Sequence, residues 1–197
     1  MTLRITSTST SISKYDEILL NHRKTMIPQI EPYITNIAST DFFSGLESLI
    51  EKSPENLLDF FKENKHKLNI PQLDTYNNYE VIYRNNTAQD RYEMKWHYDN
   101  KKLIKHKISD LHKIHNIQIV HMDDKYIYGL YTNKPIRYTI IIYLDTYRED
   151  FTGGEFHFYN QTIYPRRGML LFFTADELHK VSLLKSGRRR AVVVKIY

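Results

Sequence analysis

The chain contains no cysteine among its 197 residues. This absence excludes disulfide bonds, thiolate metal sites and cysteine nucleophiles. Any bound metal must therefore be held by His, Asp or Glu, a ligand set that suits iron, manganese or zinc better than copper(I). The chain also lacks the G-x-S-x-G elbow of hydrolases and the glycine-rich loop that cradles phosphates in kinases, so neither reading has support.

Long apolar runs are missing as well. No stretch reaches the roughly 18 apolar residues of a membrane span, and the Ser- and Thr-rich segment Met1–Lys14 lacks the apolar core of a secretory signal. We therefore expect no membrane partner and a cytoplasmic or otherwise intracellular location. The net charge of +5 permits an acidic or nucleic-acid partner but is too small to require one.

The first third of the chain predicts helices, because its apolar residues recur at three- and four-residue spacing. We expect helices over Tyr15–Arg23, Ile27–Ile37 and 40–50, the last with Thr40 as its N-cap. Ser53-Pro54-Glu55 combines an N-cap residue, a proline at the first helical position and an acid in the first turn. It predicts a further helix to about Lys67, and Pro71 should end this helical region.

After Tyr76 the pattern changes to aromatic and β-branched runs separated by turn residues, which is typical of strands. Helices followed by many short strands predict a mainly β protein of the α+β kind. We expect residues 1–75 to form a helical support packed on a core of residues 76–197, in one compact domain. The expected strands are Glu80–Arg84, Tyr92–Tyr98, Ile117–His121, Tyr126–Tyr131, Ile136–Leu144, Glu155–Tyr159, Met169–Thr174, His179–Leu184 and Arg189–Tyr197.

Two histidines and an aspartate form a candidate metal site. His97 and Asp99 are two residues apart, so on a strand both side chains point to the same face and can hold one ion. His179 opens a later expected strand and offers a third ligand. Two His and one carboxylate on one face of iron(II) leave positions open for a cosubstrate and dioxygen. Alone the His-x-Asp triplet is a weak signal, because a chain with nine histidines contains such triplets by chance.

The order of motifs after His97 strengthens this hypothesis. They are the strand Ile136–Asp145, then Gly153-Gly154-Glu155-Phe156-His157-Phe158, the turn Pro165–Gly168 into Met169–Phe173, then His179-Lys180-Val181 and Gly187-Arg188-Arg189. This series resembles the iron(II)- and 2-oxoglutarate-dependent dioxygenase superfamily, and within it the prolyl 4-hydroxylase-like branch, from about Tyr83 to Tyr197. The resemblance implies a double-stranded β-helix (jelly roll) with N-terminal supporting helices and with iron near one mouth.

The resemblance assigns the iron ligands to His97, Asp99 and His179. Its basic residue for the far carboxylate of 2-oxoglutarate corresponds to Arg189, ten residues after His179. A buried carboxylate favours a planar, always-charged donor with two prongs, which agrees with arginine at this position. The neighbours Arg188 and Arg190 should point to the opposite face of the strand and be surface residues.

Three further residues are expected in the cosubstrate pocket. Tyr143 matches a family position whose hydroxyl helps to hold the same carboxylate, and Thr139 shares its strand face. Tyr83, on the strand before the metal strand, resembles another pocket tyrosine, although its spacing to His97 is longer than in the family. The implied cofactors are iron(II), 2-oxoglutarate as cosubstrate and dioxygen, with ascorbate as an accessory reductant.

A second His-x-Asp triplet, His121-Met122-Asp123, lies in a segment that is longer than is usual in the family. We favour His97 and Asp99, because 122–125 is typical of a turn that joins strands Ile117–Val120 and Tyr126–Leu130 into a hairpin. The inserted segment, 101–124, is basic and holds four histidines without an acid or cysteine framework for zinc. We expect a solvated insertion that could serve as a lid or substrate flap.

The resemblance implies hydroxylation of a substrate with release of succinate and carbon dioxide. Our first choice of substrate is a peptidyl side chain, proline before lysine, so a protein or peptide partner is expected. A nucleic-acid demethylase is the alternative enzyme, since Arg189 and Lys195 share one strand face and the insertion is basic. A non-enzymatic β-barrel binding module is the alternative of a different class. The sequence carries no signal for the oligomeric state.

Overall fold

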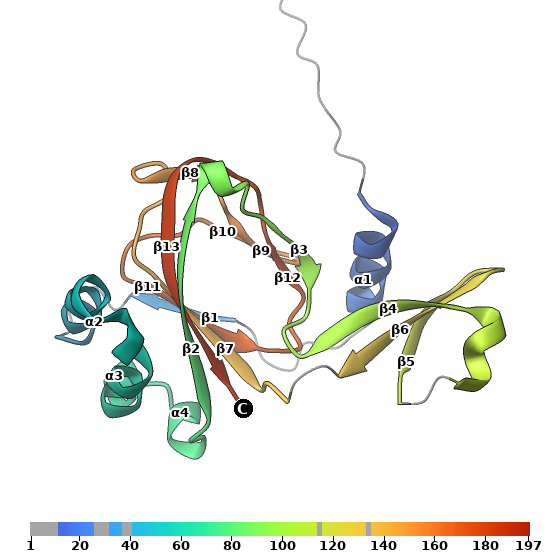
Figure 1. Cartoon of the computed structure of the whole chain (residues 1–197), viewed down its shortest axis with the longest axis horizontal. Helices are drawn as coiled ribbons and strands as arrows, with labels where there is room; N and C mark the ends of the chain where they lie inside the picture. Colours follow the sequence, from blue (N-terminus) through green and yellow to red (C-terminus); the bar gives the residue numbers. More distant parts are fainter. Residues whose placement is uncertain (1–11, 26–31, 37–40, 114–115, 133–134) are drawn as a thin grey trace, which may run out of the picture.

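Two antiparallel sheets face each other in the computed structural model, which describes residues 12–25, 32–36, 41–113, 116–132 and 135–197 (Figure 1). The larger sheet contains β1 (Tyr33–Asn36), β2 (Tyr79–Thr87), β7 (Tyr138–Tyr143), β8 (Phe151–Gly153), β11 (Met169–Thr174) and β13 (Leu184–Ile196). Its order is β1-β11-β7-β13-β2, with β8 also paired to β13. The smaller sheet contains β3 (Met94–His97), β9 (Phe156–Phe158), β10 (Thr162–Ile163) and β12 (His179–Val181), in the order β10-β9-β12-β3. The expected mainly β, jelly-roll architecture is confirmed.

Strand β13 shows how alternation divides the two faces of the larger sheet. Val192, Val194 and Ile196 belong to the core between this sheet and the helices. Ala191 and Val193 belong instead to the core between the two sheets. Because side chains on a strand alternate between faces, the odd-numbered residues of β13 point into the jelly roll. Arg189 and Lys195 are therefore on the inner face.

Three helices cover the outer face of the larger sheet, beside β2 and β13 in Figure 1. They are α2 (Asp41–Lys52), α3 (Leu57–Asn64) and α4 (Gln72–Thr75), with 3-10 turns η1 (Pro54–Asn56) and η2 (Lys65–Leu68) between them. Phe42, Phe61 and Leu73 are buried against the sheet. Removing such apolar surface from water, at about 25 cal/mol per Å², is what attaches helices of this kind to a sheet.

Two details of the helical region differ from the predictions. Ser53 precedes the 3-10 turn η1 but makes no side-chain cap hydrogen bond. Pro71 does not end the helical region, because the short helix α4 begins directly after it. Proline is well tolerated at a helix start, where its missing N–H has no partner to lose.

The helix predicted over Ile27–Ile37 is wrong where the structure describes it. Tyr33–Asn36 forms strand β1, which pairs with β11 at the edge of the larger sheet. Pro32 lies immediately before this strand and disfavours a continuous helix, whereas Ile34 and Thr35 are β-branched. The rest of that predicted helix, and the Thr40 cap, lie outside the described residues.

The inserted segment is a folded sheet of its own. It comprises β4 (Lys101–Lys107), β5 (Gln118–Met122) and β6 (Tyr126–Thr132) in the order β4-β6-β5, with the 3-10 turn η4 (Ile108–Lys113). The predicted β5–β6 hairpin is confirmed, but the sheet extends past residue 124 to Thr132. Helix α1 (Lys14–Thr25) lies between this sheet and the jelly roll (Figure 1). Among the described residues, no helix combines the length and apolar character needed to cross a membrane.

Candidate metal and cosubstrate site

Three side chains meet at the mouth of the jelly roll. His97 ends β3, Asp99 follows two residues later, and His179 begins β12 directly opposite His97 in the register of the two strands. One ligand atom from each of the three lies within 4.8 Å of the others. Asp99 Oδ1 is 3.9 Å from His97 Nε2, and Asp99 Oδ2 is 3.9 Å from His179 Nε2. This spacing can accommodate one metal ion between the three groups.

Both imidazole rings are oriented by hydrogen bonds to backbone carbonyls. His97 Nδ1 is 2.7 Å from the carbonyl oxygen of Lys95, and His179 Nδ1 is 2.8 Å from that of Glu177. A carbonyl accepts only, so each Nδ1 carries the proton and each Nε2 presents a lone pair towards the other ligands. Within the described part of the chain, His97 Nε2 is buried without a hydrogen-bond partner. The arrangement fits a divalent metal with two imidazoles and one carboxylate as ligands.

The protonation states also suit a metal. Burial lowers the pKa of His97, and it lowers the pKa of His179 to about 3. Burial by itself would raise the pKa of Asp99, but the positive charge of Lys195 and the hydrogen bonds from Lys195 and Thr139 outweigh it and lower that pKa. At neutral pH the site therefore presents neutral imidazoles and an ionised carboxylate, which are the forms that bind metals.

The second oxygen of Asp99 is held by two residues of the larger sheet. Thr139 Oγ1 donates a hydrogen bond of 2.6 Å to Asp99 Oδ2, and Lys195 forms an ion pair with the same oxygen. Thr139 lines the cavity as expected, but its hydroxyl points to Asp99. Lys195 was not among the predicted site residues. Its six-residue spacing from Arg189 already indicated that both side chains lie on the same face of the strand.

A cavity of about 200 Å³ connects these ligands to Arg189. Arg189 is only 3% exposed, and its guanidinium lies 5.2 Å from the ring centre of Tyr143. Arg189 Nε and Tyr143 Oη are both buried, and neither has a hydrogen-bond partner among the described residues. Burial raises the pKa of Tyr143 to about 12, so its hydroxyl remains a donor at neutral pH. Buried donors without partners are costly, and a bound carboxylate would satisfy both.

Asn86 is a third such donor, and sequence reasoning missed it. It is paired with Arg189 across β2 and β13, so both side chains point to the inner face. Its Nδ2 is buried and has no hydrogen-bond partner in the part of the chain that the structure describes. The cross-strand register identifies this residue, and nothing in the local sequence does.

The Gly153-Gly154 pair makes room for Arg189. Gly153 and Gly154 have φ angles of +71° and +65°, which favour glycine. A Cβ on Gly154 would lie 3.0 Å from Arg189 Cδ, and one on Gly153 would lie 2.1 Å from the carbonyl oxygen of Leu183. The glycine motif of the sequence is therefore explained by close backbone packing beside the buried arginine.

Several predicted placements need correction. Tyr83 packs with the core on the helix side of the larger sheet, because it is paired with Val192, and it does not line the cavity. Tyr92 lines the cavity instead. Arg190 is no free surface residue, since it forms a 2.6 Å ion pair with buried Asp145.

Two other histidines lie apart from the three candidate ligands. Phe156 and Phe158 face the core, and the Nδ1 of His157 between them is 3.0 Å from Thr162 Oγ1. His22 is buried beside Tyr98.

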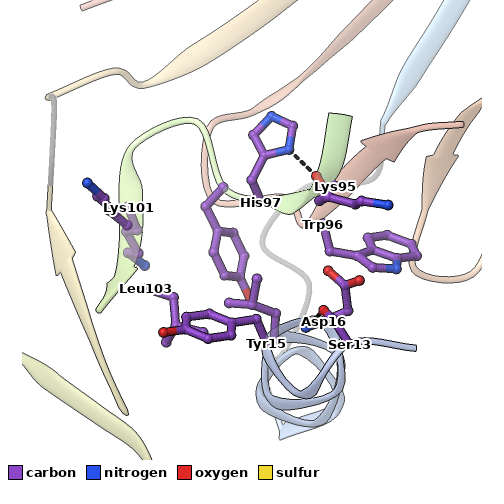
Figure 2. Close-up of a pocket in the computed structure, with 11 residues that line it drawn as sticks. Ser13, Tyr15, Asp16, Lys95, Trp96, His97, Lys101 and Leu103 are labelled. Carbon is purple, nitrogen blue, oxygen red and sulfur yellow. Dashed lines mark hydrogen bonds between the residues drawn. The ribbon is translucent and has the colours of Figure 1, made fainter. Parts of the chain in front are cut away.

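A groove of about 420 Å³ reaches the same site from outside. In Figure 2, Tyr15 and Asp16 of α1 lie on one side, Leu103 of β4 on another, and His97 at the far end. His97 lines both this groove and the inner cavity. The groove is therefore the natural route by which a substrate would approach the three ligands.

Comparison with known proteins agrees with this geometry. The model of the 2OG-Fe(II) oxygenase superfamily matches residues 81–197. The chain belongs to this superfamily. The "2-oxoglutarate and iron-dependent oxygenase domain-containing protein 3" of Xenopus tropicalis is 39% identical to this oxygenase over 77 residues. That alignment covers 36% of the oxygenase chain and 23% of the length of the Xenopus protein.

Solved structures share the fold of this oxygenase at low sequence identity. A Pseudomonas putida prolyl-4-hydroxylase matches with a TM-score of 0.51 and 12% identity, covering 91% of the oxygenase chain and 93% of the other. HygX from Streptomyces hygroscopicus, in a structure with nickel and 2-oxoglutarate bound, matches with a TM-score of 0.52 and 13% identity. That match covers 94% of the oxygenase chain and 86% of the HygX chain. The expected double-stranded β-helix is thus shared with known oxygenases.

Proposed function

We propose that this oxygenase uses iron(II) and 2-oxoglutarate to hydroxylate a peptidyl side chain, proline before lysine. His97, Asp99 and His179 would hold the iron, and Arg189, Tyr143 and Asn86 would hold the far carboxylate of 2-oxoglutarate. The observation that carries the proposal is that one cavity is lined both by three converging metal ligands and by Arg189, whose buried Nε has no hydrogen-bond partner among the described residues.

When bound, iron(II) with 2-oxoglutarate supplies the activation of dioxygen, with which a substrate C–H becomes C–OH while 2-oxoglutarate yields succinate and carbon dioxide. The residues of the chain bind and orient the reactants for this step. Thr139 and Lys195 hold one oxygen of Asp99, which leaves the other free for a metal. The planar guanidinium of Arg189 would bind the far carboxylate of 2-oxoglutarate with two hydrogen bonds and so fix the orientation of the cosubstrate in the cavity. The buried ring of Phe156 lines the cavity and stacks on His179, with ring centres 5.2 Å apart.

The groove supports a polypeptide substrate over the alternatives. It is open to solvent, mostly apolar, and flanked by Trp96, Tyr98 and Leu103, so an extended chain can lie in it with one side chain near His97. Two features favoured nucleic acid in the sequence. Arg189 and Lys195 face the inner cavity and are unavailable for phosphates at a surface. The basic insertion brings Lys101 and Lys102 to the groove, but Lys101 is paired with Asp176. Membership in an oxygenase family and the intact ligand set oppose a binding module without activity.

The first test is spectroscopic. We expect a visible metal-to-ligand charge-transfer band when 2-oxoglutarate is added to the anaerobic iron(II) protein, in wild type and His121→Ala but not in His97→Ala. A band lost only in His121→Ala would move the site to the other triplet. Absence of a band in wild type would contradict the proposed cofactors.

The second test concerns the substrate. Succinate release should rise above its uncoupled background with proline-containing peptides and less with lysine-containing ones. Stimulation by single-stranded oligonucleotides alone would overturn the peptide assignment. Mass spectrometry of the product should show a gain of one oxygen atom on the peptide.

A further inference from the structure

The backbone of residues 175–177 supports two of the three candidate metal ligands. The Asp99 N–H donates to the carbonyl oxygen of Ala175 at 3.1 Å, and His179 Nδ1 is 2.8 Å from the carbonyl oxygen of Glu177. The rotation of the His179 ring therefore depends on where the peptide of Glu177 lies. A shift of this short segment would move a ligand nitrogen, even with every ligand present.

The side chain of Glu177 points away from the cavity to Arg23 on α1. Arg23 Nη2 lies 3.0 Å from Oε1 and 3.1 Å from Oε2 of Glu177, and Arg23 Nε lies 3.2 Å from Oε1. The two side chains are only 10% and 8% exposed. A buried arginine fork on a carboxylate has a narrow geometry, so it fixes position as well as charge.

Stability alone is a weak reason for such a pair. The desolvation of two buried charges can match or exceed their attraction, and apolar residues of the same volume often serve a fold equally well. Helix α1 also has other attachments: Lys14 pairs with Asp123 at 2.5 Å, and Leu19 packs with Tyr98. The directional contact of Arg23 with Glu177 therefore calls for a role in placing the segment before His179.

We propose that Arg23 is a positioning residue for the metal centre, acting through Glu177 on His179. This role rests on the proposed function, because it assumes that His97, Asp99 and His179 bind a metal. Helix α1 lies before residues 81–197, the part matched by the superfamily. An element outside the residues that the superfamily model matches thus completes the support of a candidate ligand inside them, and the centre reaches full affinity only with α1 docked.

The test measures metal binding and needs no substrate. Cobalt(II) is titrated anaerobically into wild type, Arg23→Met, Glu177→Met, the double variant and Lys14→Met, and its visible absorption gives both affinity and ligand geometry. Loss of an outer partner of a metal-bound histidine usually weakens metal binding by about 10- to 100-fold. Arg23 is one contact further from the metal, and its loss leaves the Glu177 carbonyl in place, so we expect a loss at the lower end of this range, about 10-fold, for Arg23→Met, with a changed cobalt spectrum. The double variant should lose about as much cobalt(II) affinity as either single variant, well short of the sum of the two losses, because both changes break one contact.

Lys14→Met is the matched control. It removes the ion pair at the other end of the same helix, far along the sequence from any ligand, and should bind cobalt(II) within about twofold of wild type. Trp96, the only tryptophan, packs against the apolar cluster that contains Leu19 of α1 and lines the groove together with α1, so its fluorescence reports whether α1 is docked in each variant. Should Arg23→Met fail to fold, Arg23→Lys is used instead. It keeps the positive charge but loses the two-pronged guanidinium contact with Glu177, and its cobalt(II) affinity is expected to fall several-fold.

Three results would contradict the proposal. Equal affinity and spectrum for wild type and a folded Arg23 variant would remove the positioning role while leaving the proposed function intact. Fully additive losses in the single and double variants would show that Arg23 and Glu177 act separately. No cobalt(II) binding by wild type would instead overturn the proposed function, and the positioning role with it.

Discussion

His97-Tyr98-Asp99 and His121-Met122-Asp123 share one pattern but have different surroundings. The first triplet ends a strand of the jelly roll, where His179 faces it across the sheet. The second leads into the turn of a hairpin in the inserted sheet, where Asp123 Oδ1 accepts the N–H groups of Lys125 and Tyr126. Among the described residues, only the first triplet belongs to a group of three potential metal ligands. The partner across the sheet, rather than the triplet, distinguishes the candidate metal site.

The largest expected difference between the two triplets appears when one histidine is removed from each. His97→Ala should lower cobalt(II) or iron(II) affinity by more than the roughly 100-fold that loss of an outer partner causes, because it deletes a ligand. Succinate formation should become undetectable. His121→Ala should leave both unchanged, as measured by metal titration and by succinate assay. The reverse pattern would place the metal in the inserted sheet.

The next effect concerns the far end of the cavity. Arg189→Ala should raise the KM for 2-oxoglutarate by about 10- to 100-fold, since a charge-assisted contact contributes roughly 1.5–3 kcal/mol. Iron(II) affinity without cosubstrate should change little. Arg188→Ala, on the exposed neighbouring position, is the control and should have a wild-type KM. An effect of Arg188 as large as that of Arg189 would contradict the assignment.

A smaller effect is expected from Asn86. One amide donor to a carboxylate is lost in Asn86→Ala, which should raise the KM for 2-oxoglutarate by about 3- to 10-fold, with kcat unchanged. Asn85 is exposed and points to the other face of β2, so Asn85→Ala should behave as wild type. Equal KM values for Asn86→Ala and wild type would exclude Asn86 from the cosubstrate site.

The smallest expected effect is on stability, and it comes from Asp123 of the second triplet. The hydrogen bond with Lys14 lowers the pKa of Asp123 to about 2, from an ordinary value of 3.8. A carboxyl whose pKa is lower in the folded state stabilises the fold above its unfolded pKa, and this contribution disappears as the pH falls through the folded value. Wild type should therefore melt slightly above Asp123→Asn at pH 7, and the difference should narrow below about pH 4. Metal affinity at pH 7 should be equal in both proteins.

Much of the jelly roll could be predicted because its strands carry strong local signals. The run from Tyr138 to Tyr143 is apolar and β-branched, and the Gly153-Gly154 pair marks a turn that only glycine adopts without strain. Strand β1 was mistaken for a helix because its four residues gain their structure from pairing with β11, which no local pattern shows. Strand β4 was missed because its lysines obscure the alternation of a strand.

The sequence alone determined the family, the mainly β fold, and the ligand candidates His97, Asp99 and His179, because these depend on residue type, order and spacing along the chain. Only the tertiary structure decided which face each strand turns inward. It therefore placed Tyr83 outside the cavity, Asn86 beside Arg189, and Arg23 behind Glu177. These relations arise from register between strands and from docking of a helix, and such contacts join residues too distant in sequence for any local pattern to encode.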